Sequence, residues 1–223
     1  MNRCAVFDLD GCLIDSAPDI VASVNEMRVG FRLPPLPFER VLSFVGNGAR
    51  TLIERALRDD AAAPGVDEAL AVYRECYNRR LTRETKLYPA VPQWLDVMRN
   101  AGYRLAVFTN KPQDSAERIL LSLGVDDLFE YVIGNGGRFP LKPEPDALLF
   151  LLEEFQADPD ASWMIGDNWT DLECGMRAGF RTAFLSKGYG TARTLIPDLS
   201  AETFPELLRQ IRAWDEKTEN RDS

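Results

Sequence analysis

Short apolar runs of strand length recur along the chain, and after residue 90 they alternate with stretches whose apolar residues repeat at helical spacing. Short runs rich in Val, Ile and Phe are typical of strands buried inside a sheet. Strands joined through helices form βα units, and successive units build a parallel sheet. The pattern therefore predicts an α/β fold, with strands at residues 4–7, 105–108, 131–133, 162–165 and 182–185.

Glycine and proline mark the ends of the predicted helices in this part of the chain. A helix over residues 113–123 stops at Gly124, and one over residues 168–178 stops at Gly179. Glycine ends helices because it readily adopts the left-handed conformation found there. Pro205 is expected in the first turn of the last helix, where the missing N–H of proline is not needed.

Between residues 17 and 86 the pattern changes to helices without strands. A stretch of about 70 residues without a strand is long for a single crossover connection. We therefore predict a helical domain at residues 17–86, inserted into a sheet domain made of residues 1–16 and 87–223. The alternative is that these helices simply pack on the sheet. Turns rich in proline and glycine separate the predicted helices, which are expected at residues 19–29, 38–44, 49–57 and 67–81.

Composition and charge exclude several classes of function. Of the 223 residues, 45% are hydrophobic, which suffices for a core, and no apolar run is long enough to span a membrane. A strand begins almost at the N-terminus and leaves no room for a signal peptide, so we expect a cytoplasmic protein without a membrane partner. The net charge of −9 argues against nucleic acid, whose binding normally needs clustered Lys and Arg. No pattern indicates the oligomeric state.

The chain contains no histidine, and its four cysteines show no paired spacing. A zinc site is therefore not expected, and Ser-His-Asp and Cys-His nucleophilic chemistry are excluded. The cysteines are interpreted as reduced thiols. Carboxylates and lysines remain as proton carriers. The polar stretch from Asp215 onward predicts a frayed end.

Two carboxylates follow the first predicted strand. Asp8 and Asp10 lie just before Gly11, at the carboxyl end of a buried strand, where open α/β sheets build their sites. The alternation of side chains places both on one side of the strand, close enough to repel unless a proton or a cation intervenes. A divalent metal ion would relieve the repulsion. A pair of helix or turn caps is the alternative interpretation.

This stretch, from Arg3 to Ser16, resembles the first motif of the haloacid dehalogenase superfamily of phosphotransferases. Three further motifs follow in the family's order, so the resemblance spans essentially the whole chain. It implies a Rossmann-like parallel sheet with a helical cap inserted after the first strand. The further motifs are Val107-Phe108-Thr109-Asn110-Lys111-Pro112, Leu141-Lys142-Pro143-Glu144-Pro145 and Met164-Ile165-Gly166-Asp167-Asn168-Trp169-Thr170-Asp171.

The resemblance assigns roles to the acids. Asp8 is implied to be the nucleophile that becomes an aspartyl-phosphate and a metal ligand. Asp10 is implied to give a proton to the leaving alkoxide and take one from water, while its backbone carbonyl binds the metal. Asp167 belongs to the metal shell, and Asp171 to a second shell that orders a water or the lysine. Oxygen-only ligands favour Mg²⁺ as the cofactor. A helix N-cap with a first-turn acid is the alternative for Asp167 and Asp171.

The second and third motifs supply donors for a phosphoryl group. Thr109 and the amide of Asn110 follow a strand and are expected to point into the same crevice, although a threonine there is often a cap. Lys142, held between prolines, resembles the third-motif lysine that neutralises Asp8 and the phosphate; alone it would be a solvated surface charge. Lys111 is interpreted as a further cation for drawing in phosphate or as a solvated charge.

A glycine-rich turn is the candidate for recognising the rest of the substrate. Gly46, Asn47 and Gly48 can open their amides toward an anion at the start of a helix, and Arg50 could clamp a carboxylate or phosphate. A plain turn with an exposed arginine is the alternative. The tract resembles the cap loop of bacterial phosphoglycolate phosphatases.

The sequence departs from the family pattern near the predicted metal site. Cys12 stands where threonine is usual, either as a harmless small residue or as an oxidisable thiol, and Trp169 is bulkier than the residues common at its position.

The motifs lead to a Mg²⁺-dependent phosphatase for a small phosphorylated metabolite, with 2-phosphoglycolate as the first candidate. Because the motifs define only the phosphoryl end, a phosphosugar mutase or a pyrophosphatase of the same superfamily remains open. The absence of histidine favours hydrolysis over the mutase. A catalytically idle protein that binds a phosphometabolite is the alternative from another class.

Overall fold

The computed structural model describes residues 2–219. Within them, a parallel six-stranded sheet has the strand order β5-β4-β1-β6-β7-β8. The predicted α/β class is thereby confirmed. The first strand lies at the centre, and later strands extend the sheet in both directions from it. The strands are β1 (Arg3–Phe7), β4 (Tyr103–Pro112), β5 (Tyr131–Asn135), β6 (Trp163–Gly166), β7 (Arg181–Leu185) and β8 (Leu199–Ala201).

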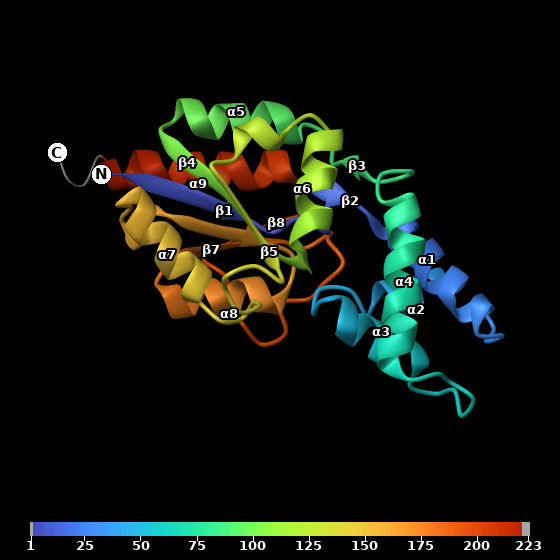
Figure 1. Cartoon of the computed structure of the whole chain (residues 1–223). Coiled ribbons are helices and arrows are strands. Elements are labelled where there is room, and N and C mark those ends of the chain that lie inside the picture. The colour runs from blue at the N-terminus through green and yellow to red at the C-terminus, as the bar shows by residue number, and fades with distance from the viewer. Residues whose placement is uncertain (1, 220–223) are drawn as a thin grey trace.

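Helices cover both faces of the sheet (Figure 1). β1 shows why: Ala5 and Phe7 face one hydrophobic cluster, Cys4 and Val6 face the other, and all four are fully buried. A strand without a polar face needs a layer on each side. One layer consists of α5 (Val91–Asn100), α6 (Gln113–Ser122) and α9 (Phe204–Glu219), and the other of α7 (Asp146–Phe155) and α8 (Trp169–Ala178).

The helices predicted between residues 17 and 86 lie together beyond the carboxyl ends of the strands (Figure 1). Two short strands, β2 (Ile14–Asp15) and β3 (Lys86–Leu87), pair antiparallel where the chain leaves the sheet and returns to it. On this arrangement we propose that residues 17–86 form the cap domain and that residues 1–16 and 87–223 form the core. The helices are α1 (Ala17–Gly30), α2 (Phe38–Leu42), α3 (Ala49–Leu57) and α4 (Val66–Arg80).

Helix ends follow the predicted punctuation. Gly179 ends α8 with a φ of 79°, and Gly48 precedes α3 with a φ of 85°. Pro205 lies in the first turn of α9. The prediction of a frayed end from Asp215 is wrong as far as residue 219, because α9 continues and the Asp215 carboxylate accepts a hydrogen bond from the Tyr103 hydroxyl. The remainder of that tail lies outside the described residues.

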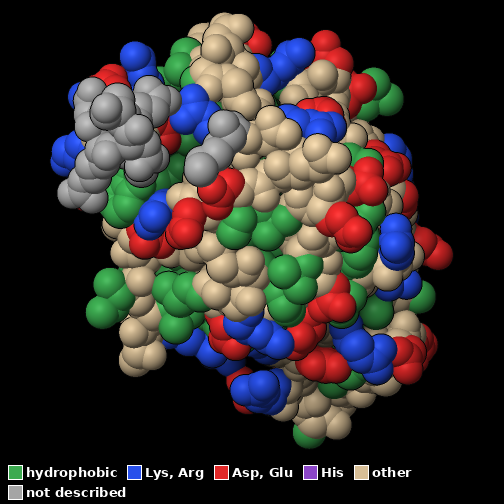
Figure 2. Space-filling model, turned by 90° about the vertical axis from the view of Figure 1, so that its left-hand side faces the viewer, with side chains coloured by type: hydrophobic (Ala, Val, Ile, Leu, Met, Phe, Trp, Pro, Cys, Tyr) green, Lys and Arg blue, Asp and Glu red, His purple; other side chains and the backbone are tan. Residues whose placement is uncertain are grey.

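The surface carries both signs of charge. Figure 2 shows the end of the core next to the chain termini, where basic and acidic side chains intermingle instead of gathering by sign. None of the helices in the described part of the chain is long and apolar enough to cross a membrane. The four cysteines are buried and unpaired.

Candidate active site

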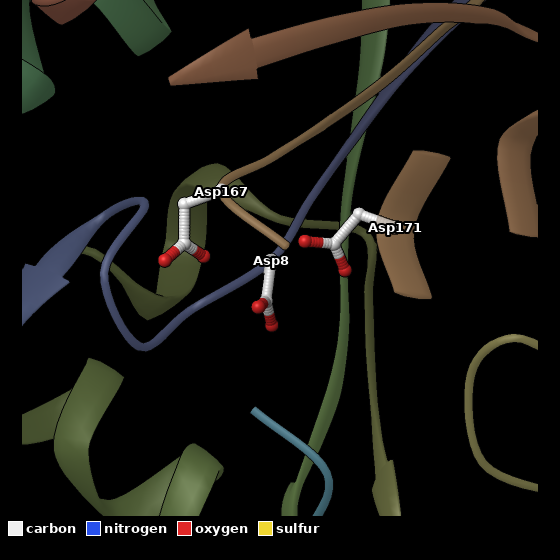
Figure 3. A group of neighbouring side chains, drawn as sticks. All are labelled: Asp8, Asp167 and Asp171. Atoms are coloured by element: carbon white, nitrogen blue, oxygen red, sulfur yellow. The ribbon is translucent and has the colours of Figure 1, made fainter. Parts of the chain in front are cut away.

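Three acids meet at the carboxyl ends of the central strands. Asp8 follows β1, Asp167 follows the neighbouring strand β6, and Asp171 lies in the first turn of α8. Each offers a carboxylate oxygen within 4.8 Å of the others, and all three are buried. Figure 3 shows Asp8 between the other two.

Lys142 joins two of these acids. Its Nζ lies 2.8 Å from Asp8 Oδ1 and 2.7 Å from Asp171 Oδ1, and the residue is only 3% exposed. Burial acts to lower the pKa of Lys142, but the charges of Asp171 and Asp8 outweigh it and raise the pKa above its ordinary value. The side chain is therefore an ammonium in the site, and the alternative of a solvated surface charge is wrong for Lys142.

Asn110 holds the backbone of Lys142 in place. Its Oδ1 accepts a 2.9 Å hydrogen bond from the Lys142 N–H, and its Nδ2 donates to the carbonyls of Lys142 and Gly46. The side-chain amide is thus fully occupied within the protein. Donation from this residue to a phosphoryl group stays a prediction for its backbone N–H alone.

Asp167 is fixed by a glycine-rich loop after β7. Its Oδ2 accepts hydrogen bonds from the backbone N–H groups of Tyr189, at 2.6 Å, and Gly190, at 2.9 Å. A Cβ on Gly188 would lie 2.2 Å from the Asp167 Cβ, so only glycine lets the loop approach this closely. The two hydrogen bonds from the loop hold the Asp167 carboxylate in one orientation.

Asp171 also satisfies the start of α8. Its Oδ2 accepts from the Asn168 N–H at 2.9 Å, and Asn168 is the N-cap of the helix. The helix-start interpretation is therefore correct for Asp171, alongside its ion pair with Lys142. For Asp167 it is wrong, because the cap is the next residue along the chain.

The acid cluster carries more negative charge than Lys142 neutralises. Burial, together with Asp171 and Asp10, raises the pKa of Asp8 to about 6 against the pull of Lys142. Burial and the charge of Asp8 raise the pKa of Asp167 well above its usual range. In the described part of the chain, Asp8 Oδ2 and Asp167 Oδ1 receive no hydrogen bond, which leaves one oxygen of each free for a ligand. This oxygen-only set fits a hard divalent cation such as Mg²⁺.

Asp10 lies outside that cluster. Both of its carboxylate oxygens accept hydrogen bonds from Lys111 Nζ, at 2.8 and 3.0 Å, and Oδ1 also accepts from the Ser16 hydroxyl. Lys111 is 6% exposed, so its interpretation as a solvated charge is wrong. The expected relief of the Asp10 charge was a divalent metal ion, whereas the structure places the Lys111 ammonium on this carboxylate. Metal binding through the Asp10 carbonyl stays a prediction.

A cavity of about 550 Å³ opens between the core and the helices α1, α3 and α4. Asp8, Asp10, Thr109, Asn110 and Lys111 line its core side, and Thr109 is 2% exposed. The cap side includes Ile20, Val45, Gly46, Gly48, Leu52, Tyr73, Arg74 and Tyr77. Most of the predicted catalytic residues therefore face a shared space large enough for a small metabolite.

The glycine-rich turn touches the core directly. Gly46 has a φ of 112°, and a Cβ there would lie 2.2 Å from Asn168 Nδ2. Its carbonyl accepts the Asn110 hydrogen bond described above. The predicted open backbone is thus present at Gly46 and Gly48, both of which line the cavity. Asn47 is not among the lining residues.

Arg50 is the predicted site residue that the structure does not bring to the cavity. Its guanidinium is exposed and pairs with Asp67 at 2.6 Å and with Glu54 at 3.3 Å. Arg50 is the second residue of α3, and it does not line the cavity, whereas its neighbour Ala49 does. The arginine that lines the cavity is Arg74 of α4, which is exposed and, among the described residues, makes no ion pair.

Sequence reasoning missed two further contributors, Tyr189 and Tyr77, and it did not predict that Lys111 pairs with Asp10. Tyr189 accepts hydrogen bonds through its hydroxyl from the N–H groups of Ser16 and Ala17, and so ties the Asp167 loop to the start of the cap. Its flanking glycines were a usable signal for a close approach. Lys111 and Tyr77 carried no such signal, because their contacts lie far away along the chain.

Near the acids, Cys12 is fully buried, and its Sγ contacts the Ile165 carbonyl at 3.6 Å. Burial and the neighbouring charge of Asp8 raise the pKa of this thiol well above its usual range, which keeps it protonated. Trp169 packs under the Arg193 guanidinium, 3.8 Å from the ring centroid. Neither departure from the family pattern removes a group from the acid cluster.

Comparison with known proteins agrees with the geometry. The family model described as haloacid dehalogenase-like hydrolase matches residues 5–185. The chain is 34% identical to phosphoglycolate phosphatase 1 of Pseudomonas aeruginosa, covering 93% of this chain and 79% of that protein. It is 35% identical to the phosphoglycolate phosphatase of Haemophilus influenzae, and the match covers 91% of this chain and 95% of that protein. The crystal structure of a predicted phosphoglycolate phosphatase from Haemophilus somnus superposes with a TM-score of 0.85 at 28% identity, covering 93% and 97%.

Proposed function

The chain belongs to the haloacid dehalogenase-like hydrolase family, and from this premise we propose that it is a cytoplasmic, Mg²⁺-dependent phosphatase that hydrolyses 2-phosphoglycolate. The observation that carries the proposal is the convergence of Lys142 and Asp167 on Asp8, which lines a cavity together with Asp10. Several relatives that match over most of their length have this activity in their names.

The residues divide the reaction into two displacements. Asp8 attacks phosphorus and forms an aspartyl-phosphate, which water then hydrolyses. Lys142 and the Thr109 hydroxyl lie where they can meet the charge on the phosphoryl oxygens. Asp8 and Asp167 would hold the metal ion, which neutralises phosphoryl charge when bound. Asp10 gives its proton to the leaving glycolate oxygen and afterwards takes one from the attacking water.

The first test is phosphate release from a panel of phosphoesters. Purified protein is assayed with 2-phosphoglycolate, phosphosugars, nucleotides and pyrophosphate, with Mg²⁺ and with EDTA. We expect one strong preference, for 2-phosphoglycolate, and loss of release in EDTA that added Mg²⁺ restores. A preference for pyrophosphate would replace 2-phosphoglycolate as the proposed substrate. Transfer between phosphosugars without release would indicate a mutase, and tight phosphate binding without turnover would indicate a binding protein.

Arg74 and Arg50 provide a second prediction. The carboxylate of 2-phosphoglycolate needs a cation, and Arg74 lines the cavity whereas Arg50 pairs with acids outside it. Arg74→Ala should lower kcat/KM for 2-phosphoglycolate by roughly 10- to 100-fold, the value of a hydrogen bond to a charged group, and change it little for 4-nitrophenyl phosphate. Arg50→Ala is the matched control. Equal losses in both variants would remove Arg74 from recognition of the carboxylate.

A further inference from the structure

Lys111 occupies a position between the core and the cap. Its ammonium donates to both oxygens of Asp10 and is almost fully buried within the cavity wall. β4 carries Lys111, while Asp10 lies in the turn after β1, the neighbouring strand. The ends of two adjacent strands thus hold a carboxylate and an ammonium against each other in the cavity that Asp8 also lines.

An aromatic side chain of the cap covers the same ammonium. Lys111 Nζ lies 4.7 Å from the centroid of the Tyr77 ring, which is carried by α4. Tyr77 is 5% exposed, and its ring stacks on the ring of Tyr73 with the two centroids 5.7 Å apart. Its hydroxyl has no hydrogen-bond partner among the described residues, so the ring face is what Tyr77 offers to the site. The cap therefore completes the surroundings of Lys111.

We propose that Lys111, held against the Tyr77 ring, is the positioning residue for Asp10. This inference rests on the proposed phosphatase function. In the first displacement the Asp8 oxygen bonds to phosphorus, the bond to the leaving oxygen breaks, and the proton of Asp10 passes to that oxygen. Asp10 is then a carboxylate, which Lys111 stabilises and orients until it takes a proton from the attacking water.

The geometry favours this role over direct binding of a substrate carboxylate. Both oxygens of Asp10 already engage the ammonium, and the Ser16 hydroxyl holds Oδ1 from another direction. A carboxylate needs two such anchors to be fixed in direction, and misplacement by about 1 Å can cost roughly 100-fold in rate. Arg74 remains as a cavity cation for a substrate anion.

The test uses the dependence of rate on the leaving group. A proton donor matters most when the leaving oxygen is strongly basic, as in ethyl phosphate, and least for 4-nitrophenyl phosphate. Neither ester has a carboxylate. Lys111→Met should lower kcat/KM, which reports the first displacement, roughly 100-fold for ethyl phosphate and only a few-fold for 4-nitrophenyl phosphate, with inhibition by inorganic phosphate unchanged. Lys217→Met, at an exposed position of α9, is the control and should match the wild type.

Asp10→Asn supplies the second arm. If Lys111 acts through Asp10, adding Lys111→Met to Asp10→Asn should produce no further leaving-group dependence. Additive losses would overturn the proposal, as would equal losses for both esters. A loss confined to 2-phosphoglycolate would assign Lys111 to carboxylate binding instead.

If a thermal melt shows that Lys111→Met does not fold, substitutions of Tyr77 test the proposal instead. Tyr77→Phe keeps the ring and should add no leaving-group dependence, whereas Tyr77→Leu removes the ring and should reproduce the leaving-group dependence to a smaller extent. Equal behaviour of the two Tyr77 variants overturns the role of the ring. If the wild-type protein releases phosphate from none of these esters, the proposed phosphatase function is wrong. If the wild type does release phosphate and the variants lose the same fraction of activity with both esters, only the positioning role is wrong.

Discussion

Asp8→Asn should reduce phosphate release by roughly 10⁴-fold or more, the loss typical of removing a nucleophile. The amide keeps the shape of the carboxylate but cannot form the acyl-phosphate bond. It also removes an oxygen that we assign to the metal. Phosphate release with saturating Mg²⁺ measures the effect. Activity near the wild-type level would refute Asp8 as the nucleophile.

The same substitution should not destabilise the metal-free fold at neutral pH. Burial and the neighbouring acids raise the pKa of Asp8 from 3.8 to about 6, so the folded protein binds this proton more tightly than the unfolded chain. Ionised Asp8 therefore costs stability above about pH 6, and this cost disappears as pH falls to about 4. In EDTA, the melting temperature of Asp8→Asn should be higher than that of the wild type at pH 7 and about equal to it at pH 4. A lower melting temperature at pH 7 would contradict this sign.

The sequence predicted the parts of the fold that local pattern determines. Residues 4–7 of β1 form an unbroken apolar run, and the glycines at 48 and 179 mark the helix ends that the structure shows. It did not predict β8, a three-residue strand at the sheet edge with only one buried residue. It also missed the β2–β3 pair, whose strands have two residues each. Segments this short carry no periodicity, and only tertiary pairing makes them strands.

The same division applies to the site. Asp8 and Asp167 could be predicted because each follows a recognisable strand, and parallel strands end at the same edge. The partner of Lys111 could not, because Asp10 is 101 positions away and neither residue has a pattern that points to the other. Arg50 shows the converse. A motif-like setting predicted that it lies near the substrate, but a shift of one residue along the helix decides which side chain faces the cavity. Nearby Asp67 and Glu54 bind the guanidinium outside it.

Lys142→Met should affect stability and activity together. Lys142 is the ammonium between Asp8 and Asp171, and both acids are buried. Removing one partner of a buried ion pair typically costs about 3 to 5 kcal/mol, because the remaining charge stays buried without compensation. We expect a loss of that size in the free energy of unfolding of the metal-free protein at pH 7, measured by urea denaturation. Phosphate release should fall to near background, because the variant lacks the cation that meets phosphoryl charge.

The origin of that loss can be separated from a simple packing defect. If uncompensated charge is responsible, adding Asp171→Asn to Lys142→Met should recover part of the lost stability, since one buried carboxylate is gone. Lowering the pH to 5 should also recover part of the lost stability. Burial raises the pKa of Asp8, so this carboxylate takes up a proton there and one buried charge is removed. Mg²⁺ should stabilise the single variant as well, by binding the folded acids in preference to the unfolded chain. A loss that responds to none of these three changes would mean that Lys142 stabilises the fold through the packing of its methylene chain and not through its charge.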